Sequence, residues 1–66
     1  MIIEVELDKK KNEIELPEGS VVETVLACLD LHPDAFIAIR SGRPIPLTEI
    51  LINKDKVRLI RVASGG

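Results

Sequence analysis

Apolar and acidic side chains alternate at the start of the chain. In residues 3–7 every second side chain is apolar, which is the period of a strand with one buried and one solvated face. Residues 8–12 are polar, and residues 13–16 alternate again. Two alternating runs joined by a polar segment predict a β-hairpin. The lysines at 9–11 then form its solvated tip, with a basic partner-binding patch as the alternative.

The period changes after the hairpin. Ser20 and Glu23 have the S-x-x-E spacing of a capping box, which predicts a helix that opens at Ser20. The apolar residues that follow recur at i, i+3, i+4 and i+7 and form a single stripe that should face the core: Val22, Val25, Leu26 and Leu29. Pro33 disfavours helical geometry in the residue before it, so the helix should end near Leu31 or His32.

The second half of the chain reads as two strands joined by irregular segments. Residues 35–39 are all apolar, which predicts a central strand buried on both faces. A turn at residues 41–42 leads into residues 43–46, which are extended but contain two prolines and cannot pair fully; Ile45 should point inward. We expect residues 47–52 to be an irregular loop over the sheet edge. Residues 53–55 form a turn before the last strand, at 56–62.

The last strand carries apolar residues in both phases. Val57 and Leu59 share the inward phase, whereas Ile60 and Val62 lie in the opposite phase, which should face water. Either a bulge resets the phase, or the outer face of the sheet carries an apolar patch.

The order of elements is hairpin, helix, strand, loop and strand, which predicts an α+β fold. One helix would cross one face of a mixed sheet of four to five strands, with the first strand central and parallel to the last. This arrangement is the β-grasp. We therefore expect a β-grasp domain at residues 1–62 and a flexible C-terminal tail at 63–66.

Composition narrows the function classes. The 66 residues are 45% hydrophobic, with one aromatic residue and a net charge of −2. Such a balance does not predict direct nucleic-acid or membrane binding, and base-stacking aromatics are lacking. The lone Cys28 excludes an internal disulfide and multi-cysteine metal sites, which suits a reducing cytoplasm. The N-terminus shows no signal-peptide pattern. We expect a cytoplasmic monomer.

The tail is the strongest candidate for chemistry. It consists of small residues and ends in Gly65 and Gly66. Glycine has no Cβ, so such a tail could enter a channel too narrow for other residues. From Ala63 to Gly66 it could reach about 13 Å. The alternatives for the diglycine are a neutral end and a cloning scar.

A second candidate is the outer face of the last strand. Arg58 and Ile60 should share that face, and Arg61 and Val62 complete a basic and apolar strip that leads into the tail. We predict that this strip docks a partner, with scattered surface residues as the alternative. Two more arginines, at 40 and 43, could extend it.

Enzyme chemistry finds little support. Cys28 has no second cysteine or motif near it, and His32 has no visible partner, so both are interpreted as structural. The carboxylates at 4, 6, 13 and 15 lie on strand faces that look solvated. We predict that the chain is not an enzyme and binds no metal or cofactor itself.

Residues 30–33, 41–46 and 57–62, together with the diglycine, resemble the ThiS/MoaD-like ubiquitin-like sulfur carriers, and within them the small archaeal modifier proteins. The resemblance covers essentially the whole chain. The turn at residues 53–55 departs from the Gly-Asp that is common in the family, and residues 62–64 lack the prolines typical of molybdopterin-synthase small subunits. Molybdopterin-synthase small subunits are also usually longer, and these two differences from them favour a ThiS-like or modifier-like member.

The resemblance implies that a ubiquitin-activating-type enzyme, using ATP and Mg²⁺, adenylates the carboxylate of Gly66. A thiocarboxylate would then donate sulfur to an accepting enzyme, or an isopeptide bond would form on a target lysine. Gly65 would be the slender neighbour of the reactive residue. Two other functions stay open: a β-grasp protein-binding module with a functionally neutral tail, and a catalytic domain using Cys28 or His32.

Overall fold

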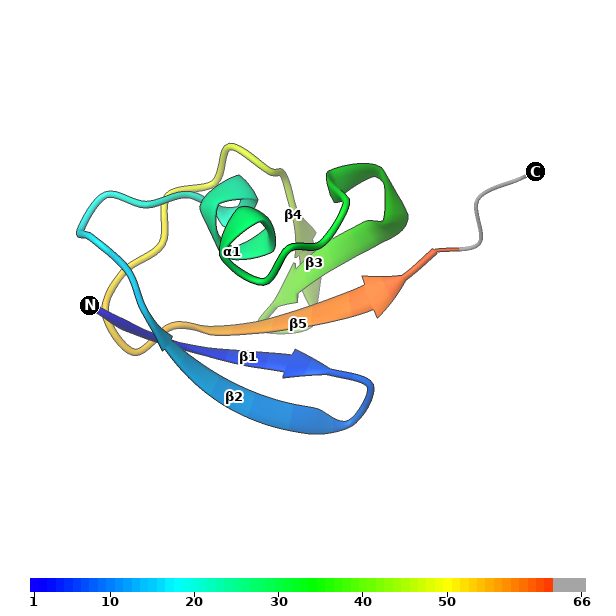
Figure 1. The fold of residues 1–66 in the computed structure, drawn as a ribbon, viewed down its shortest axis with the longest axis horizontal. Helices are drawn as coiled ribbons and strands as arrows, with labels where there is room; N and C mark the ends of the chain where they lie inside the picture. The colour runs from blue at the N-terminus through cyan, green and yellow to red at the C-terminus, as the bar shows by residue number, and fades with distance from the viewer. Residues whose placement is uncertain (63–66) are drawn as a thin grey trace.

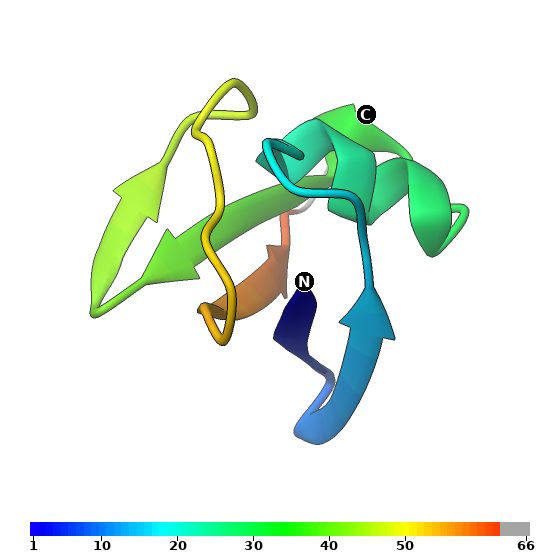
Figure 2. The same ribbon diagram turned by 90° about the vertical axis from the view of Figure 1, so that its left-hand side faces the viewer.

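The computed structural model describes residues 1–62. They form one five-stranded mixed sheet in the order β2-β1-β5-β3-β4, with helix α1 against one face (Figures 1 and 2). The strands are β1 (Ile2–Leu7), β2 (Lys10–Glu15), β3 (Phe36–Arg40), β4 (Arg43–Ile45) and β5 (Lys56–Arg61). The helix α1 spans Val22–Cys28, and a short 3-10 helix, η1, spans Pro33–Ala35. Neither helix is long and apolar enough to cross a membrane.

The first and last strands lie side by side and run parallel, as the β-grasp prediction requires. Val5 is paired with Val57 and Leu7 with Leu59, so the inward phases of the two strands coincide. Their buried side chains meet those of α1 in one core. The core consists of Ile3, Val5, Leu16, Val22, Val25, Leu26, Phe36, Ala38, Leu51, Val57 and Leu59.

The N-terminal hairpin is tighter than predicted. Its turn is Asp8-Lys9 alone, and both residues have positive φ, 53° and 65°. The five-residue polar loop expected from the sequence is wrong, because residues 10–12 belong to β2. A two-residue turn with positive φ at both positions matches the right-handed twist of the strands. Strand pairing can therefore continue up to this turn, and the polar residues 10–12 pair with β1 although their sequence suggested a loop.

The helix begins later than predicted. Ser20 does not cap it: its hydroxyl donates to the carbonyl of Pro17 at 2.7 Å, and its side chain is buried. The helix starts at Val22, and the expectation of a Ser20 capping box is wrong. The backbone carbonyls of Leu47 and Glu49 accept the first amides of the helix instead. The amide of Val22 donates to Glu49 at 3.1 Å and that of Glu23 to Leu47 at 3.0 Å.

The helix also ends earlier than Pro33 suggests. Its last residue is Cys28, and Asp30 adopts a left-handed conformation with φ 59°. The amide of Leu31 donates to the carbonyl of Leu26 at 2.8 Å, and that of Asp30 to Ala27 at 3.1 Å. These two hydrogen bonds form a Schellman motif, which ends the helix several residues before Pro33. The predicted stripe is confirmed, since Val22, Val25 and Leu26 are buried and Leu29 packs against the core.

Strand β3 is central but not buried on both faces. It pairs with β5 on one side and β4 on the other. Phe36 and Ala38 face the core, whereas Ile37 is 43% exposed. The prediction of two buried faces is wrong because the single helix covers only one side of the sheet.

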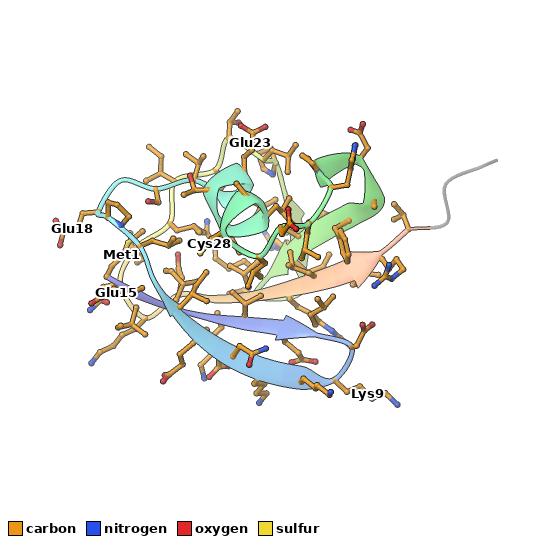
Figure 3. All side chains as sticks on the ribbon, in the orientation of Figure 1. Met1, Lys9, Glu15, Glu18, Glu23 and Cys28 are labelled. Carbon is orange, nitrogen blue, oxygen red and sulfur yellow. The ribbon has the colours of Figure 1, made fainter. Side chains whose placement is uncertain are left out.

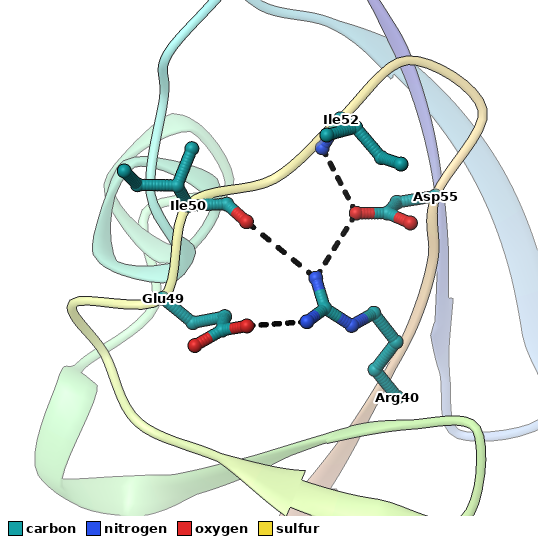
Figure 4. A network of polar contacts seen from close by, with 5 residues as sticks. All are labelled: Arg40, Glu49, Ile50, Ile52 and Asp55. Atoms are coloured by element: carbon teal, nitrogen blue, oxygen red, sulfur yellow. Dashed lines mark hydrogen bonds and ion pairs between the residues drawn. The ribbon is translucent and has the colours of Figure 1, made fainter.

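The segment before β5 is irregular, as expected, and it is fixed at both ends. Leu51 is 1% exposed and its amide donates to the carbonyl of Ser20 at 2.9 Å. The guanidinium of Arg40 contacts carboxylates of Glu49 and Asp55 and the carbonyl of Ile50 (Figure 4). This arginine therefore ties the end of β3 to the segment that caps the helix.

Candidate docking surface

Strand β5 presents two different faces. Val57 and Leu59 are buried under the helix, whereas Arg58 and Ile60 point to the outer face of the sheet. The register with β3 runs unbroken from Arg58 to Arg61, so no bulge resets the phase. Of the two possibilities that the sequence left open, an apolar patch on the outer face is therefore the one observed.

The patch is built from two strands. Ile60 of β5 stands opposite Ile37 of β3, and the two are 42% and 43% exposed. Ile39 stands opposite Arg58 in the same way and is half-buried. Side chains directly opposite on antiparallel strands are in contact distance. We call Ile37, Ile39, Arg58 and Ile60 the outer-face patch.

Arg58 marks the boundary between this patch and a charged area. Its Nε lies 3.6 Å from Oε2 of Glu6 on β1, and its side chain is 63% exposed. Shallow hollows lie on both sides of it, one bordered by Ile39 and the other by Ile60. An ion pair this exposed contributes little stability. The guanidinium is therefore accessible to an acidic group of a partner.

Arg61 does not join Arg58 and Ile60 on the outer face. It stands opposite Phe36, on the side of the core, and its Cζ lies 5.1 Å from the centre of the Phe36 ring. Its Nη2 is 3.8 Å from Oδ2 of Asp8. The predicted strip is thus divided at its end, with Arg61 at the margin of the core. Val62 is half-buried and its amide donates to the carbonyl of Ala35 at 2.9 Å.

The two further arginines also differ from each other. Arg40 is 27% exposed and is occupied by Glu49 and Asp55, so it does not extend the patch. Arg43 is exposed and is paired with Arg40 in the register of β3 and β4.

Ile37 and Ile39 are the members of the outer-face patch that the sequence did not single out. Ile37 lies in an unbroken apolar run, in which no alternation separates an inner from an outer face. Ile37 is identified only by its pairing with Ile60 across β3 and β5, and the sequence does not give the register of that pairing.

The two residues considered for catalysis, Cys28 and His32, are both exposed. Cys28 is exposed at the end of α1 (Figure 3). His32 is exposed, and its Nδ1 accepts from the amide of Asp34 at 3.3 Å. No cluster of three or more metal-binding side chains occurs within residues 1–62. Gly65 and Gly66 lie outside the described residues, which end at Val62, just after β5.

Comparison with known proteins identifies the type of fold. No family model and no curated protein sequence matches the chain. Solved structures do match over the whole chain. A ubiquitin from Caldiarchaeum subterraneum is 26% identical with a TM-score of 0.73, and 98% of it is covered. This chain has a ubiquitin-like fold.

Two further structures agree with this assignment. SAMP1 from Haloferax volcanii is 19% identical, with a TM-score of 0.75 and 100% of its chain covered. An N-terminal ubiquitin-like domain of another protein is 19% identical, with a TM-score of 0.77 and 78% of its chain covered. At this identity the likeness concerns the fold.

Proposed function

We propose that this ubiquitin-like chain acts through its C-terminal carboxylate as a sulfur carrier, a protein modifier, or both. A partner enzyme of the ubiquitin-activating type would adenylate Gly66. The observation that supports this most is the combination of a ubiquitin-like fold with a sequence that ends in Gly65-Gly66 only a few residues after β5. The archaeal neighbours, one of them named a ubiquitin, favour a modifier.

The chemistry belongs to the partner, and this chain supplies the substrate. The Gly66 carboxylate would attack the α-phosphorus of ATP, with Mg²⁺ held by the enzyme, and pyrophosphate would leave. The acyl-adenylate is an electrophile, which a free carboxylate is not. Attack by a sulfide equivalent would release AMP and leave a thiocarboxylate. Attack by a lysine amine of a target would release AMP and form an isopeptide bond.

The outer-face patch is the proposed docking surface for the activating enzyme, with Arg61 and Val62 at its margin. Exposed apolar side chains beside an accessible guanidinium suit a partner surface that is apolar with an acidic rim. Ile37 and Ile60 would be buried on docking, and Arg58 would exchange its exposed contact with Glu6 for one with the enzyme.

Deleting Gly66 tests the proposal. The purified chain, the activating enzyme of its host and ATP should yield an acyl-adenylate and pyrophosphate, whereas the deletion variant should yield neither. Glu18→Gln, an exposed change in the turn between β2 and α1, serves as the control and should react like the wild type. Undiminished pyrophosphate release from the deletion variant would exclude the proposal.

The fate of the activated carboxylate is a separate question. Intact mass of the protein isolated from its host distinguishes the two fates, since an oxygen-to-sulfur exchange marks a carrier. A ladder of larger species on a denaturing gel marks a modifier.

The outer-face patch also favours a second function, a binding module whose tail is neutral. Removal of both Gly65 and Gly66 separates the two functions. A binding module keeps its partner affinity and its cellular function without them, and a carrier or modifier loses its function.

A further inference from the structure

The free edge of strand β2 has hydrogen-bonding groups that no other strand in residues 1–62 uses. The terminal ammonium of Met1 donates to the carbonyl of Leu16 at 2.7 Å, and the amide of Leu16 donates back to Met1 at 2.9 Å. In an antiparallel ladder such doubly bonded pairs alternate with pairs that are not bonded. The backbone N–H and C=O groups of Lys11, Glu13 and Glu15 therefore point away from β1.

This edge is open in a way that the opposite edge of the sheet is not. Strand β2 is six residues long, contains no proline, and its register with β1 has no bulge. Strand β4, at the other edge, has three residues, one of which is Pro44. Proline and short length block strand addition at an edge. Of the two sheet edges within residues 1–62, the β2 edge is therefore the one that favours pairing with an added strand.

Edge strands commonly carry lysine to prevent pairing. Here, however, the charges are ordered along the strand, basic at the start (Lys10 and Lys11) and acidic at the end (Glu13 and Glu15). An antiparallel copy of the same strand places each basic half beside an acidic half. A uniformly basic strand would repel a second copy of itself, whereas the charge pattern of β2 is complementary to its own antiparallel copy.

We propose that two copies of this chain associate through their β2 edges, antiparallel and about a two-fold axis, so that their sheets become continuous. The hydrogen-bond phase restricts the register. Residues with outward-pointing groups must stand opposite one another, so odd-numbered positions face odd-numbered positions.

Charge then selects among the allowed registers. With Asn12 on the axis, Lys11 faces Glu13 of the second copy, and this pair occurs twice. Moving the axis to Glu13 places two glutamates directly opposite each other. Moving it to Lys11 places two lysines opposite each other. Like charges directly opposite on paired strands are destabilising. The register centred on Asn12 is the one without such a clash.

The ends of the strand extend the same pairing. Lys9 lies at the hairpin tip and Glu15 at the other end of β2 (Figure 3). In the register centred on Asn12, Lys9 of one copy stands beside Glu15 of the other. Lys10 stands beside Ile14 on the side of the helix.

The association is compatible with the proposed docking function and does not depend on it. Strand β1 separates β2 from β5, so the outer-face patch stays uncovered. The association of the two β2 edges is weak, because the facing charges are exposed and salt screens them. The chain is monomeric when dilute and dimeric at high concentration, which refines the expectation of a simple monomer.

Sedimentation equilibrium on the whole chain tests the proposal with charge reversals. Lys11→Glu gives an edge with acidic residues at both facing positions, and Glu13→Lys gives one with basic residues at both. Each variant alone should dimerise about tenfold or more weakly than the wild type. An equimolar mixture of the two should associate again, since every facing pair is then of opposite charge.

The doubly reversed variant, Lys11→Glu with Glu13→Lys, should recover the dimerisation of the wild type. Glu18→Lys changes the net charge as Glu13→Lys does but lies outside β2, and it should dimerise like the wild type. Circular dichroism melting of each variant confirms that it is folded. A wild type that stays monomeric at millimolar concentration, or a mixture no more associated than its components, would overturn the proposal.

Discussion

Arg40 shows how much of this small fold can depend on one side chain. Its Nη1 lies 3.2 Å from Oδ2 of Asp55, and its Nη2 pairs with the carboxylate of Glu49 (Figure 4). The same Oδ2 of Asp55 accepts the amide of Ile52 at 2.9 Å. Asp55 is 14% exposed, so this contact is less screened than a surface pair. The arginine connects strand β3 to the segment that caps the helix, a role that its sequence position does not reveal.

Arg40→Ala should therefore destabilise the protein by about 2 kcal/mol, because two partly buried carboxylates lose their charged hydrogen-bond donor. For a domain of this size the midpoint of thermal unfolding should fall by about 10 °C. Arg40→Lys keeps the charge without the two-pronged geometry and should recover part of the loss. The control is Arg58→Ala, at an exposed pair, which should change stability by less than about 1 kcal/mol. Equal melting of Arg40→Ala and the wild type would contradict this role.

At the scale of elements, the sequence predicted strands and the helix by type more reliably than their ends. The alternation at residues 3–7 and the stripe on α1 report which side chains are buried, and both are confirmed. The ends depend on other interactions. The helix starts where carbonyls of residues 47–49 accept its first amides, and the hairpin turn is set by strand twist. Neither interaction is visible in local periodicity.

The hairpin turn gives a prediction that belongs to this scale. Lys9 has φ 65°, a conformation that glycine adopts without strain. Lys9→Gly should raise the free energy of unfolding by about 0.5 kcal/mol, since relief of strain outweighs the extra freedom of the unfolded chain. The same substitution one residue later, Lys10→Gly, lies in β2 and should lower it by about 0.5–1 kcal/mol. Urea unfolding of both variants checks the pair, and the opposite order of stabilities would contradict the assigned turn.

At the scale of the whole molecule, one helix on one face of a five-stranded sheet leaves the other face to solvent. Ile37 and Ile60 stand opposite each other there because β3 and β5 are neighbours, although the two residues lie far apart in the sequence. The fold thereby concentrates an apolar patch on the strand that leads to the tail.

The proposed docking through the outer-face patch predicts a selective effect on activation by the proposed partner enzyme. Ile60→Asp should lower kcat/KM for acyl-adenylate formation by about tenfold or more, because a buried contact of the interface is replaced by an unpaired charge. Ile52→Asp is the matched control, since Ile52 is 66% exposed but lies outside the outer-face patch, and it should leave kcat/KM unchanged. Equal losses in both variants would show that general surface apolarity, and not this patch, supports docking.

The sequence by itself determined the type and order of the main elements, the inward phases of β1 and β5, and the diglycine end, because these follow from local periodicity and composition. It also located Arg58 and Ile60 on one face. Only the tertiary structure decided that Arg61 packs over Phe36, that Ile37 completes the outer-face patch and that Arg40 is occupied. The contacts of Arg40 depend on where the segment before β5 passes the end of β3, and the other two depend on which strands are neighbours and in what register. That choice is made by the burial of a shared core, over distances along the chain that a local pattern does not span.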